Sequence, residues 1–153
     1  MPWSLGNPPH VKDPRLTPTT IFWPMLAHVL LVYIVYAVLG IRRRDAVRAG
    51  TRVNHFKTRA PEPEQSATAS ANIMNQFELP VLFHVACLAL FVTAGVSTVS
   101  LTLAWLFVLS RYAHAWLHLT SNRIIYRSSA FQLGALILLA LWAWFALHLL
   151  QVV

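Results

Sequence analysis

The sequence predicts an all-α fold, an integral membrane bundle of four helices. Hydrophobic residues make up 57% of the 153-residue chain and charged residues only 11%, whereas a water-soluble domain of this length needs more polar surface to cover its core. Long stretches contain no Asp, Glu, Lys or Arg. The basic residues are grouped between these stretches instead of covering a solvated face. This pattern favours a membrane protein over a nucleic-acid-binding protein, despite the net charge of +7.

The first and last spans are identified most directly, because each is an uninterrupted apolar stretch of sufficient length. About 20 apolar helical residues cross a bilayer core that is about 30 Å thick. Residues 21–41 contain no acidic or basic residue and predict the first span. Residues 128–153 are equally free of such residues and predict the fourth span.

The two central spans share one apolar stretch, residues 79–110. As a single helix this stretch would be about 48 Å long at 1.5 Å per residue, which is too long for one crossing. The small, polar and β-branched residues that follow Gly95 predict a turn in its middle. The second span is therefore expected at residues 76–94 and the third at residues 99–119.

Residues 42–74 form the long loop after the first span. The part from residue 59 to residue 72 is rich in Pro, Glu, Ser and Ala and is expected to be irregular. Two crossings separate this loop from the loop before the fourth span, so both lie on one side. By the positive-inside rule this side is cytoplasmic and both termini lie outside. The two loops carry nine of the twelve basic residues: Arg42, Arg43, Arg44, Arg48, Arg52, Lys57, Arg59, Arg123 and Arg127. The first seven are interpreted as topology signals.

The third span carries ionisable residues, which are costly in lipid and therefore indicate function. At 100° per residue these residues fall within an arc of about 80°, so they form one stripe that must face the bundle interior, a neighbouring subunit or a water-filled cavity. A structural network that holds helices together is the alternative interpretation. The stripe consists of Arg111, His114, His118 and Asn122.

Histidines four residues apart on a helix also have the spacing of metal ligands, as His114 and His118 do. No third histidine lies at a matching depth, so no metal ligands are predicted, and a metal or haem protein is kept as a third alternative. His28, His84 and His148 are interpreted as isolated residues that satisfy local hydrogen bonds.

Asn75 and Glu78 form a second candidate group, at the entry of the second span. Three residues apart on a helix, they share a face. Glu78 is the only carboxylate near a span and is expected to pair with a cation, either Arg111 or an arginine of the loops. Pro80 has no N–H and leaves the carbonyl of Gln76 free, which predicts a local kink.

The start of the fourth span is a candidate anion site. Arg123 and Arg127 oppose the helix dipole there, which makes little sense for stability alone. Together with a hydroxyl cap from Ser128 or Ser129 and free backbone N–H groups, they can bind an anion. Anchoring of the two arginines by lipid phosphate is the alternative.

Taken in order, these residues resemble the MAPEG family, membrane-associated proteins in eicosanoid and glutathione metabolism. The resemblance extends from about residue 21 to the C-terminus. Its best local pieces are Asn75-Gln-Phe-Glu78-Leu-Pro80 and Arg111-Tyr-Ala-His114, followed by Arg127-Ser128. It implies a homotrimer of four-helix subunits, with glutathione bound between neighbouring subunits near the cytoplasmic side.

The resemblance also implies roles for single residues. Asn75 and Glu78 hold the polar backbone and the amino group of glutathione, and His114 lines the same pocket. Arg127 and Ser128 face the sulfur and are the predicted catalytic residues. A thiol beside positive charge and hydroxyl donors becomes a better nucleophile at neutral pH. The predicted cofactor-binding set is completed by Arg111, His118 and Arg123.

Three positions depart from the family pattern. Ala71 stands four residues before Asn75, where many glutathione-using members have arginine; His118 replaces an aromatic hydroxyl, and Phe131 replaces a tyrosine. These departures are typical of a divergent bacterial branch, located in the inner membrane. The leading hypothesis is a glutathione- or thiol-dependent transferase or peroxidase that acts on a lipophilic substrate from the bilayer. The alternative is a non-catalytic subunit of a larger membrane complex, or a lipid-binding protein, on the same scaffold.

Overall fold

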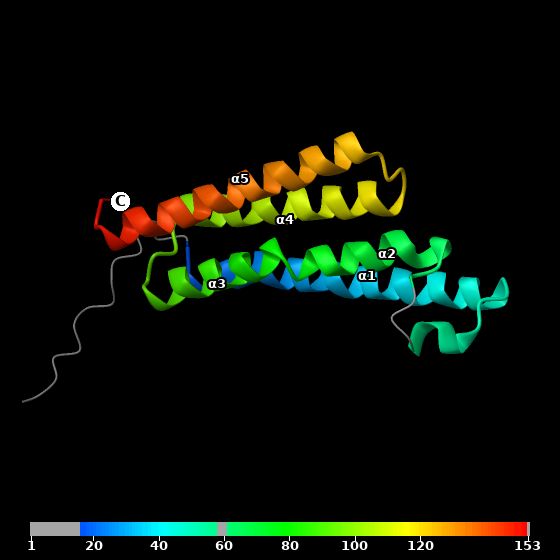
Figure 1. Ribbon diagram of the computed structural model, residues 1–153. Helices are drawn as coiled ribbons and strands as arrows, with labels where there is room; N and C mark the ends of the chain where they lie inside the picture. The colour runs from blue at the N-terminus through cyan, green and yellow to red at the C-terminus, as the bar shows by residue number, and fades with distance from the viewer. Residues whose placement is uncertain (1–15, 58–60, 153) are drawn as a thin grey trace, which may run out of the picture.

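The computed structural model of the protein describes residues 16–57 and 61–152. Every regular element in these two ranges is a helix. Figure 1 shows the long helices side by side, in the arrangement of a four-helix bundle in which α2 and α3 together form one interrupted rod. In chain order the elements are η1 (Pro18–Ile21), α1 (Phe22–Arg48), η2 (Val53–Lys57), α2 (Glu64–Gln76), α3 (Leu79–Val92), α4 (Thr98–Leu119) and α5 (Ile124–Leu149).

Helix α1 begins with the first apolar stretch and continues beyond it. Pro18 opens the preceding η1 turn, a position that suits proline because the missing N–H has no helical partner there. The 27 residues of α1 are about 40 Å long at 1.5 Å per residue, which exceeds the bilayer core. The turns from Arg42 to Arg48 therefore extend past the apolar part of the helix.

Two of the seven residues interpreted as topology signals also have tertiary partners. Arg42 donates a hydrogen bond to the hydroxyl of Thr68 and another, 2.6 Å long, to the carbonyl of Leu119 at the end of α4, where a cation complements the helix dipole. Arg43 donates two hydrogen bonds of 2.8 Å to the carboxylate of Glu62. This pairing lowers the pKa of the Glu62 carboxyl. Both arginines thus fix the ends of α1, α2 and α4 relative to one another.

Helix α2 covers residues that were expected to be irregular, so that prediction was wrong from Glu64 onward. Amphipathic helices are normally recognised by an apolar face, and the buried face of α2 is small and polar instead. Alanine, glutamate and glutamine are strong helix formers, but the prolines and serines around them concealed this signal. The buried residues are spaced three or four apart: Ser66, Ala69, Asn72 and Gln76.

The predicted kink before Pro80 is confirmed, and it is a full interruption of the helix. α2 ends at Gln76 and α3 begins at Leu79 with Pro80 in its first turn. Between them, Glu78 has a non-helical backbone with ψ of −106°. Because Pro80 has no N–H to offer to the carbonyl of Gln76, the helical ladder cannot continue across this point.

The predicted turn near Gly95 is confirmed as well. α3 ends at Val92, and Ser97 is the N-cap of α4. The Ser97 hydroxyl accepts a 3.3 Å hydrogen bond from the N–H of Ser100, whose own hydroxyl accepts a 2.8 Å bond from the N–H of Ser97. This reciprocal capping box satisfies two N–H groups at the start of α4.

Three helical segments are long and apolar enough to cross a membrane, among the residues that the structure describes: Pro18–Arg48, Glu64–Val92 and Ile124–Leu149. Helix α4 has 22 residues, about 33 Å at 1.5 Å per residue, which is also sufficient length. It is not among the three because Arg111, His114 and His118 reduce its mean hydropathy. Its crossing remains a prediction.

Buried polar side chains are concentrated in one half of the bundle, where a smaller apolar cluster of Leu31, Val35 and Ala115 also lies. The larger apolar core extends from the middle of the bundle toward the α3–α4 turn and includes the rings of Phe83 and Phe107, which stack with their centroids 4.6 Å apart. The half that adjoins the α4–α5 loop holds most of the buried polar residues: Ser66, Asn72, Gln76, Arg111, His114 and His118. This half contains the candidate site.

Candidate functional site

His114 on α4 is hydrogen-bonded to both α2 and α5. Its Nδ1–H donates a 3.1 Å hydrogen bond to the backbone carbonyl of Arg127 on α5. The other ring nitrogen, Nε2, must then be the acceptor, and the side-chain amide of Asn75 on α2 donates to it over 3.3 Å. Both nitrogens of the neutral imidazole are satisfied, so the tautomer of His114 is fixed by its partners.

His118 and Arg127 form the next contact along the stripe. Arg127 Nη1 donates to Nε2 of His118 over 3.0 Å and to the side-chain oxygen of Asn122 over 2.9 Å. A guanidinium has no acceptor, so His118 carries its proton on Nδ1. That Nδ1 is buried and has no hydrogen-bond partner.

Arg111 is the most unusual residue of the stripe. Its side chain is fully buried, and Nε, Nη1 and Nη2 all lack a hydrogen-bond partner. The guanidinium lies over the ring of Phe131, with its central carbon 5.2 Å from the ring centroid, a cation–π contact that offsets part of the cost of burial. Phe131, at the position where the family resemblance led us to expect a tyrosine, therefore contacts Arg111 through its ring.

Glu78 was expected to pair with Arg111 or with a loop arginine. It is exposed at the α2–α3 interruption and makes no ion pair with another described residue. The expected ion pair of Glu78 was therefore wrong among the described residues.

Arg123 and Ser128 lie at the same end of the bundle, outside this network of hydrogen bonds. α5 begins directly after Arg123, earlier than predicted, and no side chain caps it. The prediction of a hydroxyl cap was therefore wrong. Ser129 donates instead to a carbonyl of its own helix over 2.9 Å, and Ser128 is exposed. The N–H of Arg127 is also taken, by the carbonyl of Arg123 at 3.1 Å.

Four polar residues near the site were not among the predicted ones. Asn72 lies in the part of α2 that was expected to be irregular, and Gln76 ends α2 where the second span was expected to begin. His28 and His84, interpreted as isolated, are hydrogen-bonded to each other over 3.2 Å. The spacing of Asn72, Asn75 and Gln76 along one helix was the available signal. The pairing of two histidines on different spans could not be read from the sequence.

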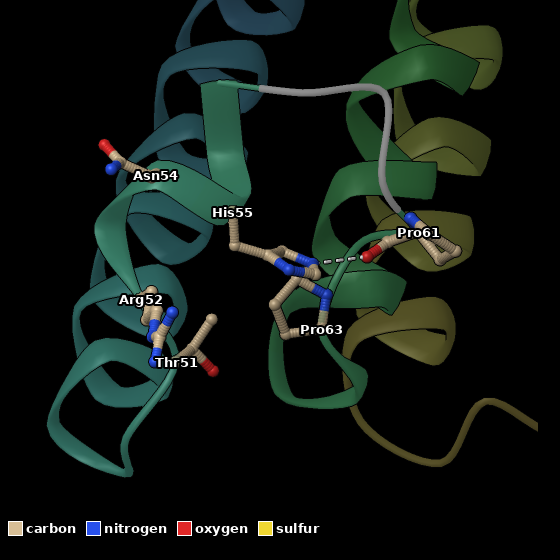
Figure 2. A pocket seen from close by; sticks show the side chains of 6 residues that line it. All are labelled: Thr51, Arg52, Asn54, His55, Pro61 and Pro63. Atoms are coloured by element: carbon tan, nitrogen blue, oxygen red, sulfur yellow. Dashed lines mark hydrogen bonds between the residues drawn. The ribbon is translucent and has the colours of Figure 1, made fainter.

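A separate hollow of about 440 Å³ lies in the loop after α1. Figure 2 shows its residues around His55, whose ring is hydrogen-bonded to the carbonyl of Pro61 at 2.8 Å. None of the predicted site residues contributes to it. The lining consists of Thr51, Arg52, Asn54, His55, Pro61 and Pro63.

The site presents more hydrogen-bond donors than acceptors. Within the part of the chain that the structure describes, every buried side-chain nitrogen or oxygen without a partner belongs to Arg111 or His118, and each of these atoms is a donor. Leaving buried donors unpaired is costly. Acceptor-rich, anionic groups are the chemistry that satisfies them. No cluster of three or more potential metal ligands occurs among the described residues.

One of the comparisons with known proteins, the family model, agrees with the resemblance seen in the sequence. Residues 20–147 match the MAPEG family. No match was found among curated proteins or among solved structures. The family match covers α1 to α4, all but the last two residues of α5, and all the candidate residues from Asn75 to Ser128. The chain therefore belongs to the MAPEG family, the membrane proteins of glutathione and eicosanoid metabolism.

Proposed function

We propose that this protein is a glutathione- or other thiol-dependent transferase or peroxidase that acts on a lipophilic substrate. The observation that carries the proposal is the set of buried donors on Arg111 and His118 without partners. Glutathione carries two carboxylates and, when ionised at sulfur, a third anionic group. It also carries an amino group, for which Glu78 is the only carboxylate at the site.

In this proposal the residues of the chain bind and orient the ligand and supply positive charge beside its thiol. Asn75 and Glu78 bind the polar backbone of the ligand, and His114 fixes the side-chain amide of Asn75. Glutathione supplies the thiol, and a thiol beside a guanidinium is more readily ionised, which makes it nucleophilic. Arg127 has its guanidinium held in place by two acceptors, His118 and Asn122.

The exposed position of two predicted ligands supports a pocket that a second subunit completes. Glu78 and Ser128 are exposed in a single subunit, whereas the unpartnered donors of Arg111 and His118 are buried. A neighbouring subunit in a homotrimer would cover this face. This assembly is part of the proposal.

Access for the lipophilic substrate is supported by the first turn of α5. Ile124, Ile125 and Tyr126 precede Arg127 and are 72%, 77% and 56% exposed. These apolar side chains stand at the end of a membrane helix, where a lipid-soluble molecule can approach from the bilayer. The reacting carbon or oxygen atom would then lie close to the charge of Arg127.

Titration calorimetry with glutathione on the protein purified in mild detergent tests the proposal. Binding at millimolar ligand, accompanied by ultraviolet absorbance of a thiolate, is the expected result. Arg127→Ala should weaken binding about tenfold or more, since hydrogen bonds to charged groups contribute about 1.5–3 kcal/mol. Arg44→Ala, at an exposed arginine of α1 away from the site, is the matched control and should bind as the wild type does.

Failure of the wild type to bind at millimolar glutathione, together with absence of thiolate absorbance, would refute the proposal. One observation favours the second candidate, a non-catalytic subunit or lipid-binding protein: Ala71, exposed on α2, offers no charge where many members have arginine. That candidate predicts a stoichiometric foreign partner or bound lipid after extraction in mild detergent, and assembly defects in Arg127→Ala and Glu78→Gln.

A further inference from the structure

A chain of hydrogen-bonded polar side chains, buried except for the partly buried His84, runs across the interruption between α2 and α3. His84 on α3 contacts His28 on α1 with 3.2 Å between Nε2 and Nδ1. His28 Nε2 lies 3.1 Å from the side-chain oxygen of Gln76 on α2. Gln76 donates over 2.8 Å to Asn72, which donates over 3.2 Å to the backbone carbonyl of Ala115 on α4.

The direction of every hydrogen bond in this chain follows from its last member. The carbonyl of Ala115 can only accept, so Asn72 uses its amide nitrogen there and accepts from Gln76 with its oxygen. Gln76 then accepts from Nε2–H of His28, and Nδ1 of His28 accepts from Nε2–H of His84. One assignment thus satisfies all four side chains, and both nitrogens of His28 are used.

His28 forms hydrogen bonds to residues on both sides of the interruption, where the helical backbone hydrogen bond to the carbonyl of Gln76 is missing. Gln76 is the last residue of α2, and Pro80 has no N–H for its carbonyl. His28 itself is almost fully buried, with 1% of its surface exposed. In apolar surroundings a hydrogen bond between helices has few competing partners, so it restricts their relative motion.

We infer that His28 is a positioning residue that sets the angle between α2 and α3 by bridging Gln76 and His84 across the interruption. Asn75 precedes Gln76 directly and is bonded to His114, and Glu78 lies within the interruption. The orientation of these two residues therefore depends on the angle that His28 sets. The consequence for ligand binding rests on the proposed function, whereas the effect on the helix angle does not.

A distance measurement across the interruption tests the inference without any ligand. Nitroxide labels are placed at the exposed positions Ala71→Cys on α2 and Leu88→Cys on α3, in a Cys87→Ser background, and the distance distribution is recorded by pulsed electron paramagnetic resonance. The labelled chain is co-expressed with an excess of the unlabelled chain, so that an assembly carries at most one labelled subunit, and a single narrow distribution is then expected for the parent protein. His28→Phe removes both hydrogen bonds and should broaden or shift it, whereas His28→Gln, which can still donate and accept, should restore it at least in part.

Tyr112→Phe is the matched control. The Tyr112 hydroxyl donates over 2.8 Å to the carbonyl of Ala27, so this variant also removes one hydrogen bond to α1, next to His28, but none across the interruption. It should leave the distribution unchanged. If His28→Phe does not fold, His84→Phe removes only the α3 side of the bridge and should broaden the distribution too.

The glutathione titration forms the second arm of the experiment. His28→Phe should weaken binding about tenfold relative to Tyr112→Phe, as the loss of one or two hydrogen bonds allows. A narrow distribution in both His28→Phe and His84→Phe, or equal broadening in Tyr112→Phe, overturns the inference. Broadening in a protein that never binds glutathione upholds the positioning role and refutes the proposed function alone.

Discussion

At the scale of single residues, the three ionisable side chains of the α4 stripe differ in how far their hydrogen bonds are satisfied. His114 has partners at both ring nitrogens, His118 at one, and Arg111 at none. A purely structural network would satisfy its members, because an unpaired buried donor costs about 1–3 kcal/mol. The proposed function accounts for the unsatisfied donors of Arg111 and His118 by assigning them to the part of the stripe that binds the ligand.

His118 gives a prediction at this scale, because its Nε2 holds the guanidinium of Arg127. His118→Phe removes that acceptor and the free Nδ1–H, and should weaken glutathione binding about tenfold. His118→Tyr restores an oxygen that can accept from Arg127 and donate to a ligand, so its dissociation constant should stay within about threefold of the wild type. Calorimetry measures both, and equal affinity of the Phe variant and the wild type would contradict the prediction.

The residues of the site could be predicted only where local spacing determines their arrangement. Arg111, His114 and His118 share a helix, so the periodicity alone placed them on one buried face. The prediction was wrong for Asn122, which is exposed and lies after the end of α4 at Leu119. Contacts between helices could not be predicted in this way. The Asn75–His114 bond joins residues 39 apart in the chain, and the His28–His84 bond joins residues 56 apart. No spacing rule predicts which faces of two helices meet.

At the scale of elements, α2 shows why one helix escaped prediction and α1, α4 and α5 did not. Apolar stretches without charges identify membrane helices directly. α2 buries Ser66, Asn72 and Gln76, and polar residues in such numbers are typical of a loop when read without their partners. Tertiary packing, through the Asn72–Ala115 bond and the arginines of α1, makes this helix stable.

The packing of α4 against α5 depends on Gly134, which gives a second prediction. A Cβ atom at Gly134 would lie 2.7 Å from the Ser110 hydroxyl, closer than real contacts allow. Gly134→Ala should therefore destabilise the protein by about 1–3 kcal/mol, despite the better helix propensity of alanine.

The double variant Gly134→Ala with Ser110→Ala is the matched rescue. It leaves the Ser110 Cβ as the nearest atom, at 3.7 Å, so most of the lost stability should return. Gly40→Ala, on an exposed face of α1 with nothing within 4 Å, should be neutral or slightly stabilising. Thermal unfolding in detergent measures all three variants, and additive effects of the two substitutions would show that the contact is not the cause.

At the scale of the whole molecule, the polarity of the buried residues changes along the bundle axis, from the apolar core around Phe83 and Phe107 to the polar half at the α4–α5 loop. Figure 1 shows that η2 and the α4–α5 loop lie at the same end of the bundle, opposite the α3–α4 turn. The arginines of both loops are therefore gathered at the end that holds the site. Under the positive-inside rule and the proposed function, one end of the bundle would thus supply both the charge that orients the chain and the charge that attracts an anionic ligand.

The crossing of α4, which its low hydropathy leaves open, gives the third prediction. Single cysteines are placed at exposed positions in a Cys87→Ser background: Asn54→Cys, Ser121→Cys and Thr93→Cys at the α3–α4 turn. The native Cys87 is buried. With a membrane-impermeant thiol reagent on intact cells, Thr93→Cys should react, and the other two should react only after the membrane is opened.

Whether residues 54 and 121 react from the same side tests the crossing of α4 independently of the orientation of the chain. If α4 crosses, two spans separate residues 54 and 121, so they lie on one side whichever way the chain is inserted. If α4 does not cross, Ser121→Cys reacts together with Thr93→Cys and opposite to Asn54→Cys. The buried stripe of α4 would then lie outside the bilayer. Contact of Arg111 with water would cost no free energy there, so avoidance of lipid would not explain why Arg111 is buried.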